Sequence, residues 1–168
     1  VFMAANHISG YNYTKLVSRQ EQAKQQQEIN DYIQSVKSRM LLGTEALDPY
    51  PYGKEKKLKW AIMTGSEAEA RELLNEILGH IFFASANDLD AIKIRAMELA
   101  VVISRAALEG GAEASSVYLL NPKFISSFFA LDTIEDICFE LSKMLRRFTE
   151  ETFNLTKVKH LDLLSRAI

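Results

Sequence analysis

Cysteine is almost missing from this chain. Cys138 is the only one among 168 residues, which excludes an intramolecular disulfide framework and favours a reducing compartment. Long apolar runs are missing too, because His80 and Glu98 interrupt the two longest candidates well below the roughly 18 residues of a membrane span. The first ten residues contain no lysine or arginine, unlike a signal peptide. We therefore expect a cytoplasmic protein that does not enter a membrane.

Patterns that carry catalysis or metal binding are also absent from the sequence. The three histidines, His7, His80 and His160, lie far apart, and none has a cysteine or a second histidine at metal-ligand spacing. No P-loop, dinucleotide-binding glycine pattern or G-x-S-x-G motif occurs. The formal net charge of -2 lacks the basic excess of a nucleic-acid-binding surface spread over the whole chain. We expect no enzyme activity, no catalytic residues, no cofactor and no metal.

Strand patterns are missing as well, whereas apolar residues recur at helical spacing. Residues 87–111 show this most clearly, because two apolar stripes run along the same predicted helix. The first stripe is Leu89, Ile92, Ala96, Leu99, Ile103 and Ala106, and the second is Ile94, Met97, Val101 and Leu108. A helix that is apolar on two sides packs between neighbours. We therefore predict an all-α fold, with this helix at the centre of an antiparallel bundle.

The other predicted helices lie on both sides of the central one. They cover residues 13–42, 54–64, 66–84, 114–120 and 122–130, then a long helix from Asp132 to about Phe153 and a separate piece at 158–168. The inward face of the 66–84 helix comprises Ala70, Leu73, Leu74, Ile77, Leu78, Ile81 and Phe82. Ser66, Asn87 and Asp132 are predicted N-caps, and Pro122 is predicted to begin a helix.

The N-terminal helix is unusually polar. Residues 18–28 contain five glutamines, and Ala23 is nearly their only apolar member. After them a short heptad seam recurs at spacings of four, three and four, formed by Ile29, Ile33, Val36 and Met40. Such a helix is not stable alone. Two partners fit the seam: the body of the same chain, or the same helix of a second copy in a homodimer.

Two prolines separate this helix from the rest. Pro49 and Pro51 disfavour helix and form a stiff connector, so we place the domain boundary between residues 1–48 and the helical bundle of residues 49–168. Within the first part, Gly10 is expected to end a helix that belongs to a preceding domain.

Polar residues mark two places on the predicted bundle. The two sets are Asn75, Glu76 and His80 on one helix, and Arg95, Glu98 and Arg105 on the third face of the central helix. A spacing of four puts Glu76 and His80 on one helix face. Two interpretations fit these residues. They are buried polar groups that tie helix to helix, or they form a small effector pocket near Asn75, His80 and Arg95.

From Pro49 onward the sequence resembles one family. The residues that carry the resemblance are Tyr50-Pro51, Glu55, Leu58, residues 69–82 (EARELLNEILGHIF), residues 95–111, residues 158–160 and the final Ala167-Ile168. They resemble the helical middle region of AraC-type bacterial transcription regulators that carry a PocR-type sensory domain. The run at 69–82 is the most specific part of this resemblance.

The resemblance implies the function that we expect. A sensor that binds an effector would precede the 13–42 helix, and a pair of helix-turn-helix units that bind DNA would follow residue 168. The chain would then be a signal-transmission and dimerisation module. Homodimers would associate through the Ile29–Met40 seam, and Arg95, Glu98 and Arg105 would hold the relay helices. The alternative is a stand-alone effector-binding helical domain.

Overall fold

The computed structural model describes residues 2–41, 50–86 and 88–166, and every regular element among them is an α-helix. The helices are α1 (Phe2–Leu41), α2 (Tyr52–Met63), α3 (Glu67–Ala84), α4 (Leu89–Glu109), α5 (Ala114–Phe129) and α6 (Ile134–Arg166). The predicted all-α bundle is therefore confirmed. Within the described residues, no helix has the length and apolar character that crossing a membrane requires.

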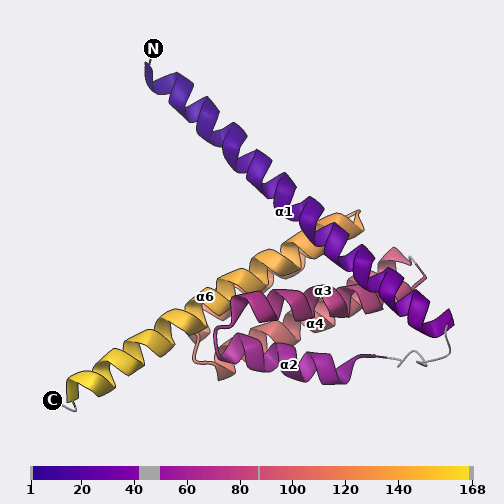
Figure 1. The fold of residues 1–168 in the computed structure, drawn as a ribbon. Helices are drawn as coiled ribbons and strands as arrows, with labels where there is room; N and C mark the ends of the chain where they lie inside the picture. The colour runs from indigo at the N-terminus through magenta and orange to yellow at the C-terminus, as the bar shows by residue number, and fades with distance from the viewer. Residues whose placement is uncertain (1, 42–49, 87, 167–168) are drawn as a thin grey trace.

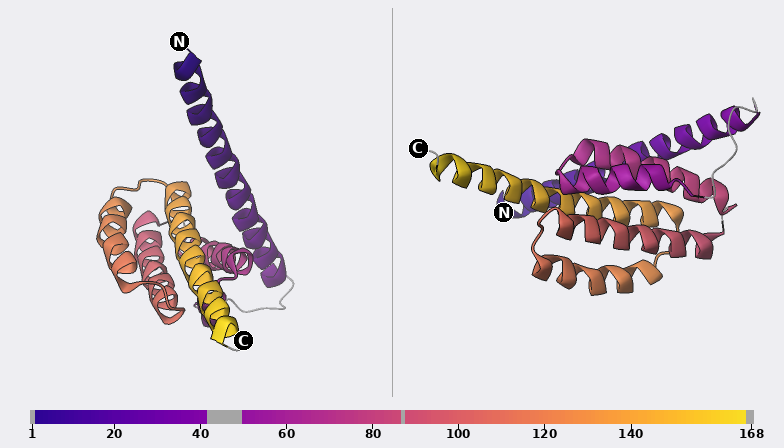
Figure 2. Two further views of the ribbon diagram at one scale, coloured as in Figure 1. Left: turned by 90° about the vertical axis from the view of Figure 1, so that its left-hand side faces the viewer. Right: turned by 90° about the horizontal axis from the view of Figure 1, so that it is seen from below.

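Helices α2 to α6 form the body, and α1 lies across it. Figure 1 shows the first half of α1 and the last half of α6 extending beyond the body in diverging directions. Figure 2 shows α1 and α5 on opposite sides of the bundle. This arrangement agrees with their contacts, since α1 packs against α3 and α6 whereas α5 packs against α4 and α6.

The core lies around α3 and α4. All seven residues predicted for the inward face of α3 are buried. The first stripe of α4 is buried as predicted, with Leu89 at its edge partly covered. Each fully buried aliphatic side chain stabilises the fold by roughly 1.5–3 kcal/mol relative to exposure. The body therefore has an extensive core of its own.

The second stripe of α4 is only partly covered. Met97 and Leu108 pack against the core, whereas Ile94 and Val101 are 61% and 49% exposed. The prediction of a helix buried on two full sides is wrong at these two positions, because the neighbours of α4 leave this part of its surface open.

Three predicted helix breaks do not occur. Helix α1 continues through Gly10, α5 continues through Pro122, and α6 runs without interruption to Arg166. A glycine within a helix costs only about 1 kcal/mol relative to alanine, which a long helix tolerates. Pro122 is exposed, so water can bind the carbonyl that loses its N–H partner.

The N-caps also differ from those predicted. Ser66 makes no side-chain cap. Asp88 caps α4 by accepting hydrogen bonds from two backbone N–H groups, whereas Asn87 lies outside the described residues. At α6 the cap is Thr133, whose hydroxyl accepts a backbone hydrogen bond at 3.1 Å, rather than Asp132. Both caps are one residue later than predicted, because adjacent residues offer similar oxygen acceptors.

Candidate functional site

The second half of α1 packs onto the body through the predicted seam. Ile29 is fully buried, Val36 is buried and Ile33 is partly buried against the same core. The structure therefore shows the first of the two arrangements considered for this seam, the one within a single chain. In this arrangement Ile29 and Val36 are already covered and are not available to a second copy. The side chain of Met40 lies outside those described.

Gly79 allows α1 to approach α3 closely. A Cβ atom at this position would lie 2.6 Å from Tyr32 Cδ1 and 3.4 Å from the backbone oxygen of Ile29. Tyr32 also contacts α2, because its hydroxyl accepts a hydrogen bond from Lys54 Nζ at 3.1 Å. The same ammonium lies 4.4 Å from the Tyr32 ring centroid and pairs with Glu76 Oε2 at 2.6 Å. These contacts join α1, α2 and α3.

Lys54 stays charged at this junction. Its burial disfavours the ammonium, but hydrogen bonds to Glu76 and Tyr32 outweigh burial and raise the pKa of Lys54 above its usual value. The ion pair with Glu76 therefore persists at neutral pH.

Gln25 lies where α1 meets α3 and α6, and it is only 9% exposed. Its Nε2 lies 3.0 Å from Asn75 Oδ1 on α3 and 2.5 Å from Ser142 Oγ on α6. The backbone oxygen of Cys138 on α6 lies further away, at 3.4 Å. Asn75 donates in return to Glu28 Oε2 on α1 at 2.6 Å. This network, which we call the Gln25 junction, positions α1 on the body through directional polar contacts.

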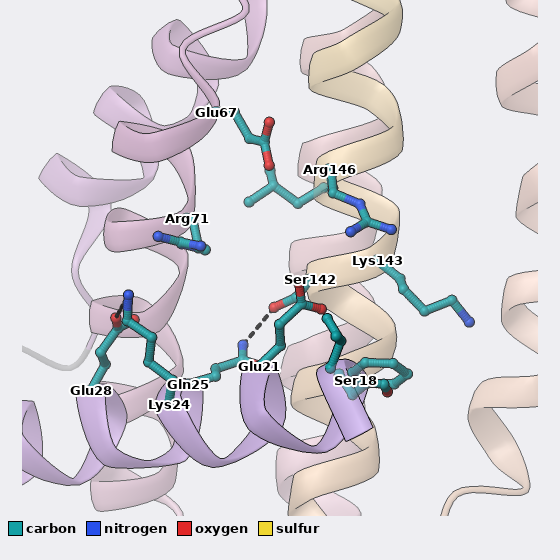
Figure 3. Close-up of a pocket in the computed structure, with 13 residues that line it drawn as sticks. Ser18, Glu21, Lys24, Gln25, Glu28, Glu67, Arg71, Ser142, Lys143 and Arg146 are labelled. Atoms are coloured by element: carbon teal, nitrogen blue, oxygen red, sulfur yellow. Dashed lines mark hydrogen bonds and ion pairs between the residues drawn. The ribbon is translucent and has the colours of Figure 1, made fainter. Parts of the chain in front are cut away.

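A pocket of about 440 Å³ opens beside the Gln25 junction, between α1, the first turns of α3 and the first half of α6 (Figure 3). Its charged lining consists of Lys24, Arg71, Lys143 and Arg146 together with Glu21, Glu28 and Glu67. Val17, Phe139 and Leu145 contribute apolar surface. Pockets of this volume accommodate small organic molecules.

The residues predicted near Asn75 and His80 do not form one site. Asn75 belongs to the Gln25 junction, and Glu76 pairs with Lys54. His80 is buried, and its Nε2 has no hydrogen-bond partner within the described part of the chain. None of these three residues lines the pocket.

The predicted charged face of α4 lies apart from the junction. Arg95 Nη1 pairs with Glu98 Oε2 at 2.8 Å on the surface, and this hydrogen bond raises the pKa of Arg95. Arg105 is exposed and makes no ion pair with a described residue. Arg95 also interacts electrostatically with Tyr52 on α2, and none of the three side chains lines the pocket.

No family model, curated protein or solved structure matches this chain.

Cys138 lies buried on α6. Burial, with a smaller effect of the nearby Glu135 carboxylate, raises the pKa of Cys138 to about 12, so the thiol stays protonated at neutral pH. Within the described residues no three histidine, cysteine, aspartate or glutamate side chains gather as metal ligands would.

Gln25 is the functional residue that the sequence analysis missed. It is one of five glutamines in a polar stretch, and composition does not distinguish it from its neighbours. Heptad spacing does not distinguish it either, because the seam continued backwards from Ile29 reaches Gln26, three residues earlier, rather than Gln25. Gln25 is identified only by its contacts with α3 and α6.

Proposed function

We propose that this chain is the signal-transmission module of a ligand-responsive bacterial transcription regulator, with α1 as the input helix and α6 as the output helix. The observation that supports this proposal is the Gln25 junction, where two long helices that both extend beyond the body meet through one buried amide (Figure 1). In the regulator, an effector sensor would act on α1, and α6 would act on helix-turn-helix domains, all outside this chain. We propose that this occurs in the cytoplasm.

The attachment of α1 is of a strength that such a signal can alter. Among its described side chains, Ile29 and Val36 are the buried apolar ones. They stabilise docking by roughly 3–6 kcal/mol together. Moving a two-state equilibrium from 1:99 to 99:1 requires about 5.5 kcal/mol. Partly buried Ile33 and the polar contacts of Gln25 and Tyr32 add to this stabilisation. We propose that a change in an adjoining domain shifts α1 against these contacts, while the body keeps its own core.

A shift of α1 would reach α6 in a single step. The Nε2 group of Gln25 donates both to Asn75 on α3 and to Ser142 on α6. Movement of α1 would break both hydrogen bonds, and each of the two buried amides, Gln25 and Asn75, would lose about 1–3 kcal/mol if it stayed buried without a partner. Helix α6 would then adopt a different position to satisfy them, which is a two-state response. While α1 is docked, a homodimer would require a surface other than Ile29 and Val36.

The proposal is tested by reading the coding sequence in frame past Ile168. We expect two consecutive helix-turn-helix patterns, each with arginine or lysine on its second helix, because that helix enters the major groove. A stop codon soon after Ile168 would contradict the proposal and favour a stand-alone effector-binding domain.

A further inference from the structure

We infer that the pocket beside the Gln25 junction binds a small zwitterion of the α-amino acid type, with its carboxylate on Arg71 and Arg146 and its ammonium on Glu21 and Glu67. This inference goes beyond the proposed function, in which the effector is bound by a sensor outside this chain. It assigns a ligand to the body itself.

The balance of charges in the pocket identifies the ligand class. Lys24 already pairs with Glu28 at 3.9 Å. Lys143 pairs with Glu140, outside the pocket, at 2.9 Å. Four charged lining residues remain, and none of them makes an ion pair with a described residue. They are Arg71, Arg146, Glu21 and Glu67, two of each sign. A simple anion would face two unpaired carboxylates. A zwitterion instead offers a carboxylate to the arginines and an ammonium to the glutamates.

The arrangement of these side chains suits a ligand with two charged ends. In the view of Figure 3, Arg71 from α3 and Arg146 from α6 lie on opposite sides of Ser142, with Glu67 above and Glu21 below. An arginine guanidinium binds a carboxylate through paired N–H groups. The pocket therefore offers a ligand carboxylate one arginine on α3 and one on α6, and it offers a ligand ammonium one glutamate on α1 and one on α3.

The floor and wall of the pocket supply the remaining contacts. Gln25 lines the pocket while 9% exposed, and its Oε1 accepts no hydrogen bond from the described residues. This carbonyl oxygen is an acceptor for a ligand N–H group. Phe139 and Val17 form an apolar wall, against which the side chain of an amino acid would pack.

Binding would stabilise the docked position of α1. The walls belong to α1, α3 and α6, so a ligand in the pocket contacts the input helix and the body together. A ligand that binds the docked form alone shifts the equilibrium towards it.

The experiment measures the Tm of the purified chain with each of the twenty common α-amino acids at about 10 mM. For a millimolar Kd, we expect the best of them to raise the Tm by roughly 3–6 °C. That amino acid is then compared with its analogues that lack the ammonium or the carboxylate. For phenylalanine these are hydrocinnamate and phenethylamine. We expect each analogue to bind at least about tenfold more weakly, because each leaves one sign of charge unpaired.

Matched variants locate the site. Arg71→Met and Arg146→Met should each weaken binding at least about tenfold without changing the Tm of the free chain, since both side chains are exposed. Arg105→Met, which removes an exposed arginine outside the pocket, should bind like the wild type.

Three results would overturn the inference. The first is that none of the amino acids raises the Tm. The second is that the analogue without an ammonium binds as tightly as the amino acid itself. The third is that Arg105→Met weakens binding as much as Arg71→Met and Arg146→Met do. Because the binding is measured on this chain alone, the result does not depend on whether DNA-binding domains follow it.

Discussion

One buried amide links three helices in this molecule. A buried polar group is costly unless it is hydrogen-bonded, and the Nε2 of Gln25 meets this condition through acceptors on both α3 and α6. The apolar contacts of Ile29 and Val36 favour docking of α1 in general. The hydrogen bonds of Gln25 favour one register among the possible ones, which is the property that a relay needs.

Cys138 makes the stability of the fold sensitive to alkaline pH. Its pKa is raised from 9.0 to about 12 in the folded chain, so the folded state binds the thiol proton more tightly than the unfolded state. This contribution to stability is complete below pH 9, and it is lost between pH 9 and 12, at about 1.4 kcal/mol per pH unit. Thiol ionisation therefore favours unfolding above pH 9.

Cys138→Ala removes this contribution. We expect the free energy of unfolding of the wild type to fall by about 1 kcal/mol more than that of the variant between pH 8 and 10, measured by urea denaturation. Tyr50 and Lys54 also have raised pKa values, but they contribute equally to both proteins and cancel. An identical pH dependence of the two proteins would show that the thiol is accessible to solvent.

At the level of helices, the sequence predicts packing faces well and helix ends poorly. Apolar spacing identified the buried face of α3 and the first stripe of α4, whereas Ile94 and Val101 of the second stripe are exposed. It did not identify the continuity of α5 through Pro122, since a proline at a solvent-exposed position loses one hydrogen bond without ending the helix. Packing of the whole helix outweighs such local preferences.

The contact of α1 with α3 depends on Gly79. In Gly79→Ala the new Cβ would lie 2.6 Å from the ring of Tyr32, so the ring must move away from Lys54. Overpacking of this kind costs about 1–3 kcal/mol, and the better helix propensity of alanine returns about 1 kcal/mol. We expect a net destabilisation of roughly 0–2 kcal/mol in urea, together with weaker docking of α1.

Gly53→Ala is the matched control. No atom lies within 4 Å of a Cβ atom at this position of α2, so only helix propensity changes. This variant should be stabilised by up to about 1 kcal/mol. If both variants gained the same stability, the close approach of α1 at Gly79 would not exist in solution.

For the molecule as a whole, the sequence indicated the elements of the site but not their assembly. The apolar seam of α1 was visible, and its partner was left open between two alternatives. The pocket combines side chains from around positions 17–28, 67–71 and 139–146. No local pattern brings such distant segments together, because each contributes ordinary surface charges that acquire meaning only when α1 crosses α3 and α6 (Figure 3).

The predicted polar residues illustrate the same limit. The sequence left two interpretations open for Asn75, a helix-to-helix contact or a pocket with His80 and Arg95, and it indicated no partner on the N-terminal helix. The actual partner, Gln25, lies fifty residues earlier in the chain. Spacing within one helix reports which residues share a face, and it carries no information on which helix will cover that face.

The most direct test of the central claim is amide hydrogen exchange of α1 under increasing denaturant, in the wild type, Gln25→Ala and Gln27→Ala. If α1 is a reversibly docked input helix, its amides between residues 25 and 36 will exchange through an opening that requires at least about 2 kcal/mol less than the opening of α3 and α4. Gln25→Ala should lower that free energy by a further 1–3 kcal/mol or so. Gln27→Ala changes an exposed neighbour and should leave the opening free energy of α1 unchanged within about 0.5 kcal/mol.

Exchange of α1 only together with α3 and α4 would contradict the account, because a helix that leaves the body only on global unfolding cannot transmit a signal.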